Sequence, residues 1–132
     1  MGRVMRVLLD THALLWWMTD DPKLSTTARN TIQDETHTVL VSAASAWEIA
    51  TKYRLGKLAI GAEVLRDFDE LITADGFSHL AVNYRQAIHA GSYSQEHRDP
   101  FDRVLAAQAE LEQVPLVTAD PALQTFPIRC LW

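Results

Sequence analysis

Four widely separated carboxylates stand where they could assemble one acidic pocket. Asp10 directly follows an apolar run at residues 4–9, and Asp120 lies two residues beyond a second apolar segment at residues 116–118. Glu48 and Asp102 each fall in the first turn of an expected helix. Because strand ends and helix starts of this kind open onto the same edge of a parallel sheet, we expect the four side chains to converge.

A pocket of this composition favours a divalent cation. Four carboxylates at one edge repel each other and raise each other's pKa, and the sequence offers no lysine or arginine as an obvious internal partner. Mg²⁺ and Mn²⁺ prefer carboxylate oxygens and water as ligands. Such an ion lowers the pKa of a bound water and neutralises charge on a phosphoryl oxygen. The set therefore predicts metal-dependent hydrolysis of a phosphodiester.

Each of these carboxylates also has a purely structural interpretation as a helix-capping group. Glu48 follows Ser45 by three residues, which is the spacing of a capping box. Asp99 before Pro100 is typical of an N-cap and first helical residue, which places Asp102 where the helix dipole favours an anion. A cap interpretation is equally open for the remaining two, Asp10 and Asp120. For Asp99 the cap interpretation is the favoured one.

Apolar periodicity predicts alternating strands and helices along the chain. The expected strands are residues 4–9, 38–41, 77–82, 115–118 and 128–131. The expected helices are residues 12–18, 25–34, 45–54, 62–74, 84–90 and 100–113. This alternation indicates an α/β fold with a parallel sheet covered by helices on both faces.

Length and composition indicate one globular domain spanning residues 1–132. Apolar residues make up 48% of the chain and charged residues 22%, which is ordinary for a soluble protein. We expect no membrane segment and no signal peptide, and a single cysteine fits a reducing cytoplasm. The net charge of −5 argues against binding nucleic acid by backbone electrostatics alone, so bound cations or local basic spots would have to assist.

Four segments of the sequence resemble, in order, the motifs of PIN-domain ribonucleases, and within them the VapC-type toxins of bacterial toxin–antitoxin pairs. The segments are VLLDTHALLW at residues 7–16, SAASAWEI at 42–49, HRDPFDRVLAAQA at 97–109 and LVTAD at 116–120. Each would be weak alone, but four in order within one short chain are a specific signal. A histidine, His12, stands where many relatives have a serine.

The resemblance implies a three-layer α/β/α sandwich with a central, mostly parallel sheet. It implies that the four carboxylates form the catalytic and metal-binding site, with Asp10 and Asp102 as the surest ligands and with support from Thr11 and Thr118. The implied activity is Mg²⁺- or Mn²⁺-dependent cleavage of single-stranded RNA. The implied partners are a cognate antitoxin and a second copy of the chain.

Several residues outside the carboxylate set complete the expectations. Arg98 and Arg103 border the acidic residues and are candidates for contact with RNA phosphates. Lys52 is expected to be a solvated charge near the end of its helix, with a contact to an RNA phosphate as the alternative. Most of the tryptophans Trp16, Trp17 and Trp47 are expected to fill the core, with one of the adjacent Trp16 and Trp17 as a candidate for an exposed surface that binds the antitoxin or the second copy.

Two alternatives to a nuclease stay open from the sequence. A receiver-type signalling domain is also acidic, of this size and binds Mg²⁺, but it needs a phosphoacceptor aspartate after a central strand and a lysine near its end. The second strand here ends in Ser42, Ala43 and Ala44, and no lysine follows Lys57. A catalytically silent PIN-like interaction module is the other alternative, and the four retained carboxylates argue against it.

Overall fold

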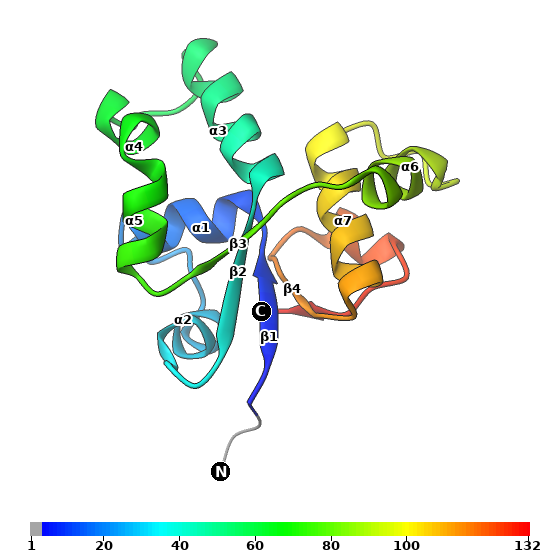
Figure 1. The fold of residues 1–132 in the computed structure, drawn as a ribbon, viewed down its shortest axis with the longest axis horizontal. Helices are drawn as coiled ribbons and strands as arrows, with labels where there is room; N and C mark the ends of the chain where they lie inside the picture. The colour runs from blue at the N-terminus through cyan, green and yellow to red at the C-terminus, as the bar shows by residue number, and fades with distance from the viewer. Residues whose placement is uncertain (1–3) are drawn as a thin grey trace.

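The strands of the described chain, residues 4–132 of a computed structural model, form one five-stranded sheet (Figure 1). They are β1 (Arg6–Leu9), β2 (Thr38–Ser42), β3 (Ser78–Leu80), β4 (Leu116–Val117) and β5 (Cys130–Leu131). The order across the sheet is β3-β2-β1-β4-β5, and every pairing among the described strands is parallel. The signal-peptide expectation concerns the N-terminus, of which residues 1–3 lie outside the described part.

Helices cover both faces of this sheet, as the sequence predicted (Figure 1). One layer contains α1 (Thr11–Met18), α2 (Thr26–Gln33), α3 (Ala43–Arg54), α4 (Ala62–Arg66) and α5 (Phe68–Ala74). The other contains α6 (Tyr84–Ser92), α7 (Pro100–Glu112) and the short 3₁₀ helix η1 (Pro121–Thr125). The α/β/α sandwich is thereby confirmed. Within residues 4–132, no helix has both the length and the apolar character needed to span a bilayer.

Two hydrophobic clusters, one on each face of the sheet, hold the layers together. Along β1 the side chains of Val7 and Leu9 join the cluster under α1 and α2, while Leu8 joins the cluster under α7. This alternation follows from the two-residue period of a strand. Because the sheet is buried on both sides, its strands read as continuous apolar runs in the sequence.

The sheet reverses its winding direction between β1 and β4. The chain passes from β1 outward to β2 and β3, and later returns to place β4 on the other side of β1. The register pairs Leu9 with Val117, so the two strands end side by side. In open α/β sheets, ligands bind outside the carboxyl ends of the strands at such a switch point.

The start of α3 differs from the sequence prediction. The helix begins at Ala43, where residue 45 was expected, because β2 runs into it without a loop and Ser42 is its N-cap. The Ser42 hydroxyl accepts a hydrogen bond from the backbone N–H of Ala44. Ser45 therefore lies inside the helix, and the capping box predicted between Ser45 and Glu48 is wrong.

The single helix expected at residues 62–74 is divided into α4 and α5 at Asp67. Asp67 adopts φ −104° and ψ 18°, and its carboxylate accepts two hydrogen bonds from the guanidinium of Arg66. Aspartate has low helix propensity because its side chain competes for local hydrogen bonds. The other elements lie where they were expected, although most of the strands are shorter, and η1 was not predicted.

Candidate functional site

Asp10 lies at the carboxyl end of β1 and begins α1. Its backbone N–H donates to the carbonyl of Val117 (3.0 Å), and its Oδ1 accepts a hydrogen bond from the backbone N–H of Ala13 (2.7 Å). The predicted N-cap role is confirmed. Asp10 is only 5% exposed, which is far more burial than a capping aspartate needs.

Burial raises the pKa of the Asp10 carboxyl from 3.8 to about 6. A hydrogen bond from the Thr118 side chain, the bond from Ala13 and the charge of His12 pull this pKa down, while the charge of Asp102 raises it. Among residues 4–132, no lysine or arginine forms an ion pair with Asp10. The carboxylate is thus desolvated and beside another anion, which is the electrostatic condition that a bound cation relieves.

Thr118 connects Asp10 with Asp120 at the end of β4. Its hydroxyl bonds the carboxylate of Asp10 and accepts the backbone N–H of Asp120 (3.0 Å). The carboxylate of Asp120 accepts from the backbone N–H of Ala122 (2.9 Å) and caps η1. The predicted cap role of Asp120 is confirmed, and the buried Thr118 orders the local geometry around two of the four site carboxylates.

Asp102 enters the site from the first turn of α7. Asp99 is the N-cap of this helix and accepts the backbone N–H groups of Phe101 and Asp102, so its predicted cap role is confirmed. The ring of His97 places Nε2 2.9 Å from Oδ2 of Asp102. Burial raises the pKa of the Asp102 carboxyl; the charges of Asp99 and Glu48 raise it further, and His97 lowers it.

Glu48 lies in the second turn of α3, where the first was expected, because the helix begins at Ala43; its side chain is buried, with the residue 2% exposed. Its Oε2 accepts a hydrogen bond from the ammonium group of Lys52, one turn further along the helix. Its Oε1 is buried and has no hydrogen-bond partner among the described residues. The expectations that the site lacked a basic internal partner and that Lys52 is a solvated charge are both wrong. Glutamate followed by lysine four residues later is the favourable order for such a pair.

The structure brings Asp10, Asp102 and Glu48 close enough for their charges to interact, and joins Asp120 to them through Thr118. Thr11 lies beside this group, where its hydroxyl donates to Ser45 (3.0 Å) and ties the start of α1 to α3. As they lie, no three His, Cys, Asp or Glu side chains within residues 4–132 form a ready ligand shell for a metal ion.

The donor chemistry of the site nevertheless fits a hard divalent cation. Mg²⁺ keeps several of its waters and needs only one or two protein carboxylates. The unpartnered Oε1 of Glu48 and the uncompensated Asp10 are oxygens of the required kind. The geometry is that of a cluster of interacting carboxylates, rather than of a closed cage of ligands.

The two arginines near α7 have different surroundings. The guanidinium of Arg103 donates to the carbonyls of its neighbouring loop and helix end, at Ala90, Tyr93, Gln95 and His97. Arg103 therefore anchors the segment that carries His97. Arg98 is exposed and lines a hollow of about 430 Å³ beside His97, where it is free to meet a solvent-borne group.

Trp47 lies on the surface next to Glu48. It is 59% exposed, and its ring meets the edge of Phe101 with centroids 4.6 Å apart. Trp47 is thus an exception to the core packing expected for most of the tryptophans, because α3 turns the buried Glu48 inward and its neighbour in sequence outward.

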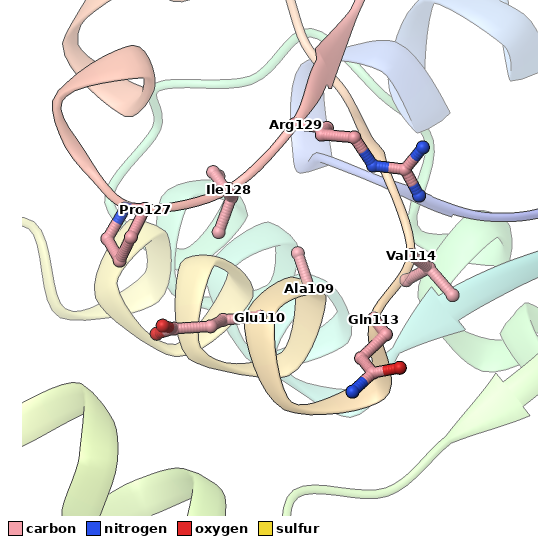
Figure 2. Close-up of a pocket in the computed structure, with 7 residues that line it drawn as sticks. All are labelled: Ala109, Glu110, Gln113, Val114, Pro127, Ile128 and Arg129. Carbon is pink, nitrogen blue, oxygen red and sulfur yellow. The ribbon is translucent and has the colours of Figure 1, made fainter.

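A separate cavity lies at the far end of α7 (Figure 2). It measures about 370 Å³ and is lined by Ala109, Glu110, Gln113, Val114, Pro127, Ile128 and Arg129. Asp102 lies in the first turn of α7, whereas this cavity lies beside the last turn of the same helix. The two turns are about 10 to 15 Å apart along the helix axis. The cavity is therefore not part of the carboxylate site.

Sequence reasoning missed two residues that touch the site carboxylates, Lys52 and His97. The four-residue spacing from Glu48 to Lys52 was a visible signal, and it was interpreted as a helix end. No periodicity links His97 to Asp102, because His97 stands in a loop before α7. Only the folded path of that loop brings the ring to the carboxylate.

Comparison with known families defines the class of this protein. The profile of the PIN domain matches residues 7–128. The chain therefore belongs to the PIN domain family, and the receiver-type alternative falls away. The match includes all four site carboxylates and the switch point between β1 and β4.

Individual relatives agree with this assignment. The chain is similar to ribonuclease VapC16 of Mycobacterium tuberculosis, with 38% identity over 72 residues, which are 52% of this chain and 51% of the relative. The match thus spans about half the length of that relative.

Two solved structures share the fold. One is DNA-bound VapBC from Salmonella typhimurium, with a TM-score of 0.71, 19% identity, and coverage of 97% of this chain and 98% of that chain. The other is VapBC2 from Rickettsia felis bound to a fragment of its promoter, with a TM-score of 0.68, 15% identity, and coverage of 96% and 98%. At these identities the likeness establishes the fold.

Proposed function

We propose that this protein is a Mg²⁺- or Mn²⁺-dependent endoribonuclease that cleaves single-stranded RNA as the toxin of a toxin–antitoxin pair. The observation that carries the proposal is Asp10. It is a buried carboxylate without a lysine or arginine partner among the described residues, at the switch point of the sheet and beside Asp102. Family membership and the similarity to a protein named ribonuclease VapC16 support the same activity.

Each site residue has a role in this proposal. Asp10 and Asp102 would hold the divalent ion, and Glu48 and Asp120 would bind it directly or through water. The ion, when bound, lowers the pKa of a water and neutralises charge on the scissile phosphate. Glu48 or Asp120 would accept the proton of the water whose oxygen bonds to phosphorus as the bond to the leaving sugar oxygen breaks.

The remaining residues position these groups. Thr118 holds the carboxylate of Asp10 by its hydrogen bond, and Thr11 fixes α1 against α3. Arg98 is exposed at the border of the site and contacts an RNA phosphate, whereas the guanidinium of Arg103 is engaged with backbone carbonyls.

The proposed partners follow from the relatives. Two of the structurally similar proteins are VapBC complexes. We extend to this chain a cognate antitoxin that inhibits the nuclease, together with a second copy of the chain. Copurification of the chain with the product of a neighbouring gene, and its mass in solution, test these two partners.

The test of the activity is cleavage of single-stranded RNA by the wild-type protein and by Asp10→Asn, with Mg²⁺, with Mn²⁺ and with chelator. We expect cleavage only by the wild type and only with metal. Asparagine retains a cap acceptor for α1, so the variant preserves the fold. Asp69→Asn, at a carboxylate 89% exposed, is the matched control and should cleave normally. Equal cleavage by wild type and Asp10→Asn would refute the proposal, and cleavage by neither would favour a silent PIN-like module.

A further inference from the structure

The ion pair between Lys52 and Glu48 supplies one of the site carboxylates with a counter-ion from the chain itself. Lys52 follows Glu48 by one helical turn on α3, and its ammonium group contacts Oε2 of that nearly inaccessible carboxylate. The Lys52 side chain is 29% exposed. It therefore reaches from solvent to the buried carboxylate, and can return to solvent by rotation of its flexible stem.

The positive charge of Lys52 acts on more of the site than Glu48 alone. The carboxylates of Asp99 and Asp102, at the start of α7, also interact with it electrostatically. Of the lysines and arginines in residues 4–132, Lys52 is the one that forms an ion pair with a site carboxylate. A single ammonium group thus serves as counter-ion for the α3 and α7 sides of the pocket.

The two oxygens of Glu48 are in different situations. Oε2 accepts a hydrogen bond from the ammonium group of Lys52, while the buried Oε1 has no hydrogen-bond partner among the described residues. A buried carboxylate with one unsatisfied oxygen is costly. That cost would fall if a cation with more than one coordination position reached the group, and such a cation would have to take the place of the Lys52 ammonium group.

We propose that Lys52 is a displaceable resident counter-ion, held on Glu48 in the metal-free protein and exchanged there for the divalent cation. This inference rests on the metal site of the proposed function and adds its regulation. Lys52 stabilises the metal-free fold by pairing a buried charge. It also weakens divalent-ion binding, because the ion must compete with an ammonium group already in place.

The test is Mn²⁺ binding measured by titration calorimetry, without RNA, for the wild type, Lys52→Met and Lys57→Met. We expect Lys52→Met to bind Mn²⁺ about tenfold or more tightly, because it removes a like charge from a poorly solvated pocket. Lys57 is exposed beyond the end of α3, so Lys57→Met should bind Mn²⁺ as the wild type does. Added Mn²⁺ should also raise the melting temperature of Lys52→Met more than that of the wild type.

A double-mutant cycle with Glu48→Gln provides a test that does not depend on Lys52→Met folding well. The variant Glu48→Gln/Lys52→Met leaves no unpaired charge at position 48, and removing Lys52 in this background should tighten Mn²⁺ binding much less than it does when Glu48 is present. Lys52→Gln, a neutral side chain that still donates to Glu48, should show the tightening seen in Lys52→Met.

The outcomes separate this inference from the proposed function. Mn²⁺ binding by the wild type that is lost in Asp10→Asn, together with unchanged or weaker binding in both Lys52 variants, would overturn the counter-ion role alone. The same tightening with and without Glu48 would also overturn it. A wild type that neither binds Mn²⁺ nor cleaves RNA would remove the metal site itself.

Discussion

The variant Asp10→Asn should make the metal-free protein more stable above pH 6, although it removes the central carboxylate of the site. The cause is the burial of Asp10, which makes its ionised form unfavourable in the folded state. Asparagine is neutral at every pH and keeps a side-chain oxygen for the backbone N–H of Ala13. The variant therefore removes the electrostatic cost while retaining the cap.

The magnitude follows from the pKa of Asp10, which burial raises from 3.8 to about 6. Because the folded protein holds this proton more tightly than the unfolded chain does, the free energy of unfolding falls as the pH rises from about 4 to about 6. At 1.36 kcal/mol per pH unit, the wild type loses about 3 kcal/mol over this window and does not regain it at higher pH. Asp10→Asn has no such loss.

The assay is urea unfolding of both proteins in chelator at about pH 4 and about pH 7.5, with the difference between variants taken at each pH. This difference cancels the groups that titrate identically in the two proteins. From about pH 4 to about pH 7.5, the free energy of unfolding of Asp10→Asn should rise by about 3 kcal/mol relative to that of the wild type. Asp69→Asn, at an exposed position, should show almost no such movement. A difference independent of pH would refute the argument that Asp10 is ionised at a cost.

Three further changes test the structure around the site. Thr118→Val removes a hydrogen bond to Asp10, so urea unfolding should show about 1 kcal/mol less stability, and the pH-dependent loss should extend to higher pH. Arg103→Met leaves four backbone carbonyls without their donor and should cost about 2 to 4 kcal/mol in the same assay, whereas Arg98→Met should cost less than about 0.5 kcal/mol. Added Mn²⁺ should raise the melting temperature of the wild type more at about pH 7.5 than at about pH 5, because protons compete for Asp10 below its pKa of about 6.

The positions of Asp10 and Thr118 could be predicted because they depend on strand ends alone. An apolar run that stops at a polar residue marks the end of a buried strand, and parallel strands end at one edge. The observed register, with Leu9 beside Val117, then puts the next residues of the two strands side by side. No contact between distant side chains had to be known for this prediction.

The start of α3 could not be predicted in the same way, because two serines satisfy the same local rule. Ser42 and Ser45 are both good N-cap residues, and the glutamate three positions after Ser45 favoured the later start. The choice depends on β2, which extends to Ser42 and leaves no residues for a loop. That extension is fixed by pairing with β3, through Ser42 and Leu80.

The contacts of His97 and Arg103 depend on the path of the loop between α6 and α7. From the sequence, Arg103 is expected to be a surface cation near an acidic residue. In the structure its guanidinium donates hydrogen bonds to backbone carbonyls of that loop. Satisfying these carbonyls decides where the arginine points. Such pairing is a property of the folded chain, and no local spacing in the sequence encodes it.

The cap and the metal-ligand interpretations of Asp10 are compatible, and the structure shows why the sequence could not separate them. Both require a carboxylate between a strand end and a helix start, and the bond from Ala13 that caps α1 also fixes the direction of the Asp10 side chain. Burial is what distinguishes the two interpretations. Asp99 caps α7 with its side chain partly open to solvent, whereas Asp10 is 5% exposed with its pKa raised to about 6. A cap gains nothing from such burial. The cost of desolvating Asp10 therefore favours the proposed role of its carboxylate as a metal ligand, which the start of α1 holds in place.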